Sequence, residues 1–319
     1  MATPTDHLGF IIGPSSVEYN EKISQRQQRW SKFLMSKGCY FSDSVPARWP
    51  SKSKQMRLLV RKGVPRAWRG SFWIHCLHAD KQLRQNPGYF DSLTKSLPKE
   101  ISDAIEKDLH RTFPDNVHFQ DPQVGVDSIK LHQLRMVLHA YALHNPKVGY
   151  CQSLNFLSAM LLLHMEPENA FWCLVSICDH FLPHVHEVTL HGLVELQNQL
   201  ETRLRQNLPS LYGSGHSQTL LLPTTSWFMS LFITTFPPET TIRLWDLIFY
   251  EGPRMVLIVA EHIFRLLLPI EGGDPFQIVQ NEPRTWPPEY VLKGLERGGM
   301  EKLKGGLRGR EWVRQLRKK

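Results

Sequence analysis

Two polar side chains suited to phosphoryl-transfer chemistry stand at the edges of apolar stretches. Arg111 lies in residues 105–114, IEKDLHRTFP, and Gln152 lies in residues 149–156, GYCQSLNF. In GTP hydrolysis, an arginine can neutralise charge on the transferring phosphoryl group and a glutamine can orient the attacking water. The pair therefore has the chemistry needed to hydrolyse GTP that is bound to another protein.

The stretch that carries Arg111 has the pattern of a helix end. Pro98 can open this helix, because a proline in the first turn loses no needed N–H group. The predicted buried face consists of Ile101, Ile105 and Leu109. Pro114 disfavours helical backbone at the residue before it, so the helix should end just after Arg111 and let the guanidinium project. Asp108 can pair with Arg111 on the helix surface. The alternative is that Arg111 serves only this pair and the helix dipole.

The stretch that carries Gln152 leads into a core helix. Pro146 ends the preceding helix and Gly149 suits a tight turn. Residues 153–165, SLNFLSAMLLLHM, are apolar nearly all round, which is typical of a buried helix. Gln152 should lie at its N-terminal end, with Ser153 available as a cap. The alternative is that Gln152 only satisfies backbone groups at this helix start.

These stretches belong to three short motifs in a fixed order. The motif residues are Gly63-Val64-Pro65 with Arg69 and Trp73, then Ile105, Asp108, Arg111 and Thr112, then Tyr150 and Gln152. The order resembles the TBC domain of Rab GTPase-activating proteins, whose patterns are R-x-x-x-W, I-x-x-D-x-x-R-T and Y-x-Q-G. Later matches at residues 170–172, 227–228 and 243–252 extend the resemblance over roughly residues 60–270. Ser153 stands where glycine is usual; because serine can cap a helix, we expect it to be tolerated.

The resemblance implies a GTPase-activating protein for a Rab-type small GTPase in its GTP-bound form, acting in vesicle trafficking. Arg111 and Gln152 would both be supplied in trans to the partner's nucleotide site. Magnesium and GTP would belong to the partner, so the chain would be no enzyme itself and would need no cofactor. The supporting residues would be Asp108, Thr112, Tyr150, Asn155, Arg69 and Trp73. The alternatives are a non-catalytic Rab-binding scaffold on the same fold and, more distantly, a helical adaptor with no GTPase partner.

Composition and periodicity indicate an all-α protein. The chain has 319 residues, of which 41% are hydrophobic and 21% charged, as in ordinary globular proteins. Apolar residues recur at helical spacing, and no convincing strand pattern or internal repeat appears. The predicted apolar stripes are Tyr19, Ile23, Trp30, Phe33 and Leu34; then Val126, Ile129, Leu134, Val137, Leu138 and Tyr141; then Leu193, Leu196, Leu200 and Leu204. Pro65, Pro98, Pro167 and Pro223 each precede an apolar-periodic run, as helix-opening prolines do. We predict an irregular multi-helix TBC domain at residues 61–271. Residues 1–60 would be an extension with an amphipathic helix, and residues 272–319 a basic tail.

The basic charge is concentrated near the C-terminal end of the sequence. Residues 291–319 carry ten Lys or Arg and three Glu, whereas the whole chain has a formal net charge of +8. This distribution argues against nucleic-acid binding by the main domain. It predicts weak contact of residues 291–319 with anionic membranes, with a solvated segment as the alternative. We see no signal peptide or membrane span, and expect a cytoplasmic protein with peripheral contact on endomembranes.

Cysteines and histidines give no strong sign of another chemistry. The five cysteines form no C-x-x-C pair, which indicates reduced thiols. Cys151 adjoins Gln152 but has no identifiable electropositive neighbourhood that would make it a nucleophile. Two histidine-containing stretches, residues 75–80 and 180–191, lack the ligand spacing of a structural zinc site, so we predict no metal.

Overall fold

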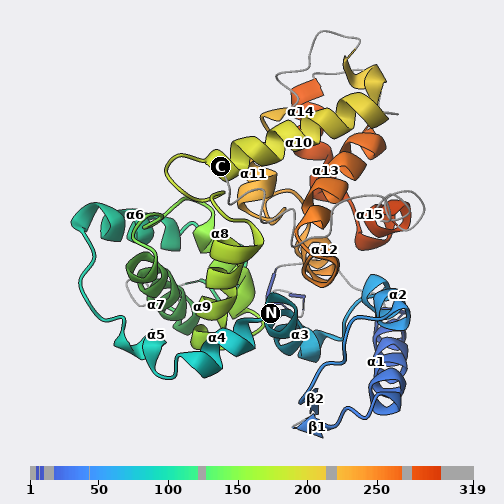
Figure 1. Cartoon of the computed structure of the whole chain (residues 1–319), viewed down its shortest axis with the longest axis horizontal. Coiled ribbons are helices and arrows are strands. Elements are labelled where there is room, and N and C mark those ends of the chain that lie inside the picture. The colour runs from blue at the N-terminus through green and yellow to red at the C-terminus, as the bar shows by residue number, and fades with distance from the viewer. Residues whose placement is uncertain are drawn as a thin grey trace. The chain divides into compact units, whose positions relative to one another are not determined.

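Helices form nearly all of the regular structure in the computed structural model (Figure 1), so the predicted all-α class is confirmed. The structure describes residues 5–6, 8–10, 18–42, 44–120, 127–212, 221–267 and 275–295. The chain divides into two compact units between Ser176 and Ile177. The domain limits expected from the sequence, at residues 60 and 271, stay predictions.

The first unit contains nine α-helices, one short 3-10 helix and one small hairpin within its described residues. They are α1 (Glu18–Ser36), β1 (Phe41–Ser42), β2 (Val45–Pro46), α2 (Lys54–Lys62), η1 (Arg66–Trp68), α3 (Arg69–Leu77), α4 (Ala79–Gln85), α5 (Tyr89–Ser92), α6 (Lys99–Leu109), α7 (Ile129–His144), α8 (Leu154–Leu162) and α9 (Pro167–Val175). The two strands pair antiparallel and are two residues long each.

The predicted amphipathic helix of the N-terminal extension is α1, and it packs within the first unit. Its Trp30, Phe33 and Leu34 are buried. The Trp30 indole N–H donates to the Gly63 carbonyl at 2.9 Å, and its ring meets the Phe72 ring edge-on at 6.1 Å. The side chains of two other predicted members of the stripe, Tyr19 and Ile23, lie outside the described residues.

Helix α7 lies at the centre of the part of this unit that carries the two candidate stretches. It packs against α6, α8 and α9, and Figure 1 shows this group in green and teal. The predicted apolar stripe is confirmed at Leu134, Val137, Leu138 and Tyr141, which are buried. It is wrong at Ile129, which is 79% exposed because it is the first residue of α7 and precedes the buried turns. Val126, also in that predicted stripe, lies outside the described residues.

Prolines stand at helix starts as predicted. Pro98 and Pro223 each occupy the residue before a helix, α6 and α11 (Thr224–Met229). Pro167 is the first residue of α9, and Pro65 immediately precedes η1. A proline at these positions sacrifices no intrahelical hydrogen bond. The start of α6, which leads to Arg111, is thereby fixed by the sequence.

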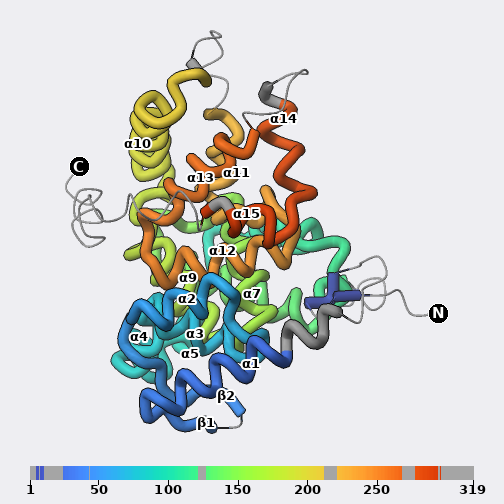
Figure 2. The backbone as a smooth tube through the Cα atoms, turned by 90° about the vertical axis from the view of Figure 1, so that its right-hand side faces the viewer, coloured from blue at the N-terminus to red at the C-terminus, as the bar shows by residue number. Residues whose placement is uncertain are grey.

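The second unit is also helical. Its remaining elements are η2 (Ser176–Phe181, a π-helical segment whose first residue ends the first unit), α10 (His191–Asn207), η3 (Pro209–Tyr212), α12 (Pro238–Glu251), α13 (Arg254–Leu267), α14 (Pro275–Asn281), η5 (Glu282–Thr285) and α15 (Pro288–Gly294). Figure 2 shows α10, α11 and α13 side by side, and these three helices contact one another. The predicted stripe on α10 is confirmed, since Leu193, Leu196, Leu200 and Leu204 are buried.

Part of the segment expected to be a tail is folded. Trp286, Val291 and Leu295 are buried, and α15 packs on α12. The Thr240 hydroxyl donates to the Trp286 carbonyl at 2.8 Å. Residues 275–295 therefore pack in the second unit. The strongly basic residues 296–319 lie outside the described residues.

Candidate functional site

Arg111 stands just beyond the end of α6. The helix ends at Leu109, two residues earlier than predicted, and His110 is its C-cap. Phe113, the residue before Pro114, has a left-handed backbone with φ of +51°. This backbone cannot continue the helix, in agreement with the effect expected of the following proline. The Arg111 side chain is 49% exposed, so its guanidinium is available to another molecule.

The buried carboxylate of Asp108 holds the Arg111 side chain. The Arg111 guanidinium forms an ion pair with Asp108, whose side chain is only 4% exposed. The Tyr150 hydroxyl donates to the other carboxylate oxygen, Oδ2, at 2.5 Å. Burial raises the pKa of Tyr150 well above its usual range, and the bond to Asp108 raises it further. The tyrosine therefore stays protonated and remains a donor to Asp108.

A second set of buried polar groups links the two candidate stretches. The Thr112 hydroxyl donates to the Asp108 carbonyl at 2.6 Å, and the Asn155 amide donates to the Thr112 hydroxyl at 2.8 Å. The Asn155 side-chain oxygen accepts from the Ser153 backbone N–H at 3.3 Å. Thr112 and Asn155 are both buried. Because buried polar groups are costly to leave unpaired, these bonds hold the two stretches together.

Gln152 is exposed in the turn that precedes α8. Among the residues that the structure describes, none forms a hydrogen bond with its side-chain amide, so the reading in which Gln152 caps the helix finds no support. The Gln152 carbonyl does accept a weak bond from the Cys151 thiol. The Gln152 side chain is therefore open to solvent.

The expectation that Ser153 caps α8 is wrong. Ser153 occupies the N-cap position, but its side chain makes no capping hydrogen bond. Its φ is +97°, whereas a capping serine needs extended backbone to turn its oxygen toward the helix. The same torsion gives a physical reason for the glycine that is usual here, since glycine adopts positive φ at little cost.

Arg69 and Trp73 lie in α3 and are both fully buried. The Trp73 ring contacts the His164 ring edge-on at 4.6 Å. Next to Arg69, a side chain at Gly70 would collide with the His164 carbonyl, because an added Cβ would lie 2.2 Å from its oxygen. This burial and close packing fit a role in holding the fold rather than contact with a partner.

The remaining candidate chemistries gain no support. Burial raises the pKa of the Cys151 thiol to about 11, so the thiolate that a nucleophile requires is scarce at neutral pH. In the described part of the chain, no three His, Cys, Asp or Glu side chains gather in a way that could hold a metal ion. Two of the histidines have other partners: His184 bonds Glu187, and His186 bonds the Met229 carbonyl.

Sequence reasoning missed the aromatic and N-terminal contacts around the Arg111 stretch. Phe113 packs against Phe156 at 5.8 Å, which adds an apolar link between the two candidate stretches. Phe10 also contacts Phe113, with ring centroids 5.1 Å apart. Asn116 is fully buried and donates to the Leu8 carbonyl at 2.8 Å. In the sequence, the only local sign of these contacts was Phe113-Pro114, which indicates an irregular loop after the helix.

The all-α fold, with an exposed arginine after one helix and an exposed glutamine before a core helix, agrees with the resemblance to a TBC domain. The sequence model of the RabGAP-TBC family, the Rab-GTPase-TBC domain, matches residues 66–268, and the chain belongs to this family. It is similar to GTPase-activating protein GYP3 of Saccharomyces cerevisiae, with 35% identity over 296 residues, 78% of this chain and 46% of that protein. It is also similar to growth hormone-regulated TBC protein 1 of Homo sapiens, with 35% identity over 248 residues, 76% of this chain and 69% of that protein.

Solved structures agree with this assignment. The Chlamydomonas flagellar RabGAP TBC domain superposes with a TM-score of 0.71 and 25% identity, covering 91% of this chain and 98% of that one. The Ypt/Rab-GAP domain of Gyp1p gives a TM-score of 0.64 at 16% identity and supports the fold alone. The chain spans about half the length of two similar Saccharomyces cerevisiae proteins, 46% of GTPase-activating protein GYP3 and 57% of GTPase-activating protein MSB4. Within the described residues, no helix combines the length and apolar character that a membrane span needs.

Proposed function

We propose that this chain is a GTPase-activating protein for a Rab-type small GTPase in its GTP-bound form. The observation that carries the proposal is that Arg111 and Gln152 are exposed while the groups that connect their stretches, Asp108, Thr112 and Asn155, are buried. The family match and the printed names of relatives such as GTPase-activating protein GYP3 support it.

Arg111 is the proposed arginine finger. Its guanidinium would enter the partner's nucleotide site and neutralise charge on the phosphoryl group in the transition state. The Asp108 carboxylate pairs with this side chain and is itself held by Tyr150. A guanidinium held in one orientation loses less entropy when it docks, and its planar fork fits phosphoryl oxygens in a way that an ammonium group does not.

Gln152 is the proposed second finger. Its neutral amide can accept from the attacking water and donate to a phosphoryl oxygen, the role that GTPases usually give to a glutamine of their own. Asn155 braces the backbone beside it by accepting from the Ser153 N–H. Tyr150 and Asn155 thus shape the turn that presents Gln152.

Magnesium and GTP belong to the partner in this proposal. The chain supplies side chains in trans, needs no cofactor and performs no hydrolysis without the GTPase. We further infer that it works in the cytoplasm, in peripheral contact with the endomembranes where its partner controls vesicle traffic.

The test is phosphate release from a panel of GTP-loaded Rab proteins with the wild-type chain and its variants. Arg111→Ala and Arg111→Lys should each lose about 10³ to 10⁵ in stimulated rate, roughly 4–7 kcal/mol of barrier. Arg84→Ala is the matched control, because Arg84 is also an exposed arginine paired with an aspartate, Asp80, on a helix. Full activity of the Arg111 variants would show that another arginine acts.

The glutamine is tested with two forms of the responsive Rab. A Rab whose own glutamine is replaced by alanine should still respond to the wild-type chain, and Gln152→Ala should lose on the order of 10² in rate with either form. Gln85→Ala, at an exposed position in α4, serves as the control. If the glutamine-less Rab fails to respond while Gln152→Ala still activates the normal Rab, Arg111 acts alone. Tight Rab binding without any stimulation would instead show a scaffold.

A further inference from the structure

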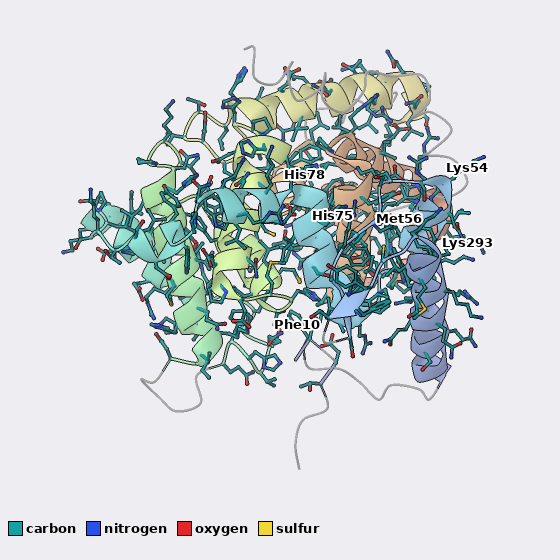
Figure 3. The ribbon with its side chains drawn as sticks, turned by 60° about the horizontal axis from the view of Figure 1, so that its bottom comes forward. Phe10, Lys54, Met56, His75, His78 and Lys293 are labelled. Carbon is teal, nitrogen blue, oxygen red and sulfur yellow. The ribbon has the colours of Figure 1, made fainter. Side chains whose placement is uncertain are left out.

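A short N-terminal segment forms a turn that its own hydrogen bonds hold together. Leu8 and Phe10 donate their backbone N–H groups to the Asp6 carboxylate at 2.8 and 2.9 Å. The Asp6 N–H donates in turn to the Phe10 carbonyl at 2.7 Å. We call the described residues Asp6 and Leu8–Phe10 the strap; Phe10 is labelled in Figure 3. The strap lies outside residues 66–268, which match the family.

The strap binds the loop that carries Arg111, residues 110–119, which we call the arginine loop. The Val117 N–H donates to the Gly9 carbonyl at 2.9 Å, and the Asn116 amide donates to the Leu8 carbonyl at 2.8 Å. Leu8 and Asn116 are buried. Backbone, polar and apolar contacts therefore all join the same two segments.

Phe113 carries the contact from the strap toward the catalytic side chains. Its ring contacts both the Phe10 ring, with centroids 5.1 Å apart, and the Phe156 ring, with centroids 5.8 Å apart. Phe113 has a left-handed φ of +51°, a conformation that a phenylalanine adopts only where its surroundings hold it. It stands two residues after Arg111, so a change in its position would move the guanidinium.

The fit at Gly9 shows how closely the strap approaches the arginine loop. A Cβ at Gly9 would lie 2.5 Å from His118 Cδ2 and 2.9 Å from Asn116 Oδ1. Neither distance is sterically acceptable, and the φ of +88° also favours glycine. The exposed His118 ring can turn away from an added Cβ, but Asn116 is buried and its Oδ1 accepts from the His118 backbone N–H, so a side chain at Gly9 would disturb the contact with Asn116.

We propose that the strap is a positioning element for the proposed reaction: by holding Phe113 and Asn116, it keeps the arginine loop in the conformation that presents Arg111. The proposal rests on the GTPase-activating function proposed above. The strap itself touches no nucleotide and supplies no reacting group. Its loss should lower the maximal rate of stimulated hydrolysis and leave the half-saturating concentration of the chain unchanged.

The experiment compares Gly9→Ala with Gly38→Ala in the full chain. Gly38 also has positive φ, +68°, but nothing lies within 4 Å of an added Cβ, so this control places a Cβ on left-handed backbone without the collision. We expect Gly9→Ala to lower the maximal stimulated rate by on the order of 10 to 100-fold, as small misplacements of catalytic groups do. Gly38→Ala should retain the wild-type rate. Equal maximal rates for the two variants would overturn the proposal, as would a change confined to half-saturation.

Two further measurements separate positioning from folding and from the proposed function. Phe10→Leu should restore most of the activity that Phe10→Ala loses, and both should melt cooperatively near the wild-type temperature. Amide hydrogen exchange of the peptide that spans the arginine loop should rise in Gly9→Ala and stay unchanged in Gly38→Ala, without any GTPase present. A wild-type chain that stimulates no Rab defeats the proposed function; unchanged exchange in Gly9→Ala defeats the strap.

Discussion

The backbone at Ser153 has a conformation that serine rarely adopts. Its φ is +97°, and its hydroxyl makes no capping bond that would offset the strain. Left-handed backbone costs a residue with a Cβ about 1–2 kcal/mol, and glycine relieves this strain. The greater chain entropy that glycine loses on folding offsets part of the gain, so we expect Ser153→Gly to raise the free energy of unfolding by about 1 kcal/mol. Urea denaturation measures the change, and the stimulated rate should be retained.

The control for this prediction is a serine in ordinary helical backbone. Ser102 lies within α6, where glycine is less favourable than serine, so Ser102→Gly should lower the free energy of unfolding by about 0.5 kcal/mol. Destabilisation of similar size by Ser153→Gly would show that the Ser153 side chain contributes a contact worth more than the strain.

Tyr150 tests whether the hydrogen bond to Asp108 helps to hold the Arg111 side chain in place. Tyr150→Phe removes the hydroxyl that donates to Asp108 at 2.5 Å and leaves the buried carboxylate with one partner fewer. Stability should fall by about 1.5–3 kcal/mol, as for hydrogen bonds to charged groups, and the maximal stimulated rate should fall several-fold because Arg111 is less firmly held. Thermal unfolding and phosphate release give the two numbers.

A tyrosine elsewhere in the first unit separates these effects. The Tyr89 hydroxyl bonds His144 Nδ1 at 3.0 Å, so Tyr89→Phe also removes a hydrogen bond. It should lower stability by about 1 kcal/mol and leave the stimulated rate unchanged. An equal loss of rate in both variants would trace the effect of Tyr150→Phe to stability alone.

Single residues were the most predictable part of the site. The spacing of Asp108 and Arg111 predicts their ion pair, which the structure shows. The roles of Arg111 and Gln152 in catalysis stay predictions. The positive φ of Ser153 was not predictable from the sequence. A serine stands where glycine is usual, but this pattern does not say whether glycine serves backbone conformation or the approach of a partner.

At the scale of elements, local patterns predicted helices well and long-range contacts poorly. Pro98 and the apolar residues after it fix α6, because both effects act within a few residues. The strap contact joins Asn116 to Leu8 over 108 positions, and no periodicity links them. Such a contact depends on tertiary packing, so a sequence without aligned relatives gives no sign of it.

The junction of α13 and α15 should make the second unit sensitive to acid. His262 on α13 is buried, and burial lowers its pKa below the ordinary value; a backbone hydrogen bond with Val291 of α15 and nearby Glu261 oppose the shift, and Arg265 adds to it. The folded state therefore binds a proton less readily than the unfolded state. Stability from this group is present above about pH 6.5 and is lost as the pH falls through the lower, folded pKa.

Replacing His262 tests this sign. Unfolding free energy measured from about pH 7.5 to about pH 5 should fall with acid in the wild type, and His262→Gln should flatten the curve. His132→Gln, at an exposed position on α7, should leave the slope as it is. A slope unaffected by His262→Gln would mean that other groups, His186 among them, cause the acid sensitivity.

At the scale of the whole molecule, the family match and the compact units do not coincide. Residues 66–268 match one family, yet the chain divides between Ser176 and Ile177. The elements that precede the match, α1 and the strap, pack in the first unit, and residues 275–295 after it pack in the second. Segments outside the family match are therefore parts of both folded units, which composition alone did not predict.

The basic residues beyond 295 lead to the last prediction, which concerns membranes. Residues 296–319 carry nine Lys or Arg and three Glu. Each basic residue near an anionic surface contributes up to about 1 kcal/mol, and salt at physiological strength screens this attraction beyond about 8 Å. Truncation after Leu295 should lower the partition coefficient onto phosphatidylserine vesicles by at least about tenfold at low salt. The cut must fall there because Val291, Leu292 and Leu295 are buried, and removal of residues 291–319 would damage α15.

A full-length variant with Arg314→Gln, Arg317→Gln, Lys318→Gln and Lys319→Gln is the control for charge. Its partition coefficient should lie between those of the complete and truncated chains, and neutral phosphatidylcholine vesicles should bind none of the three proteins. Equal co-sedimentation of the truncated and complete chains with phosphatidylserine vesicles would show that charge in this segment does not recruit the protein.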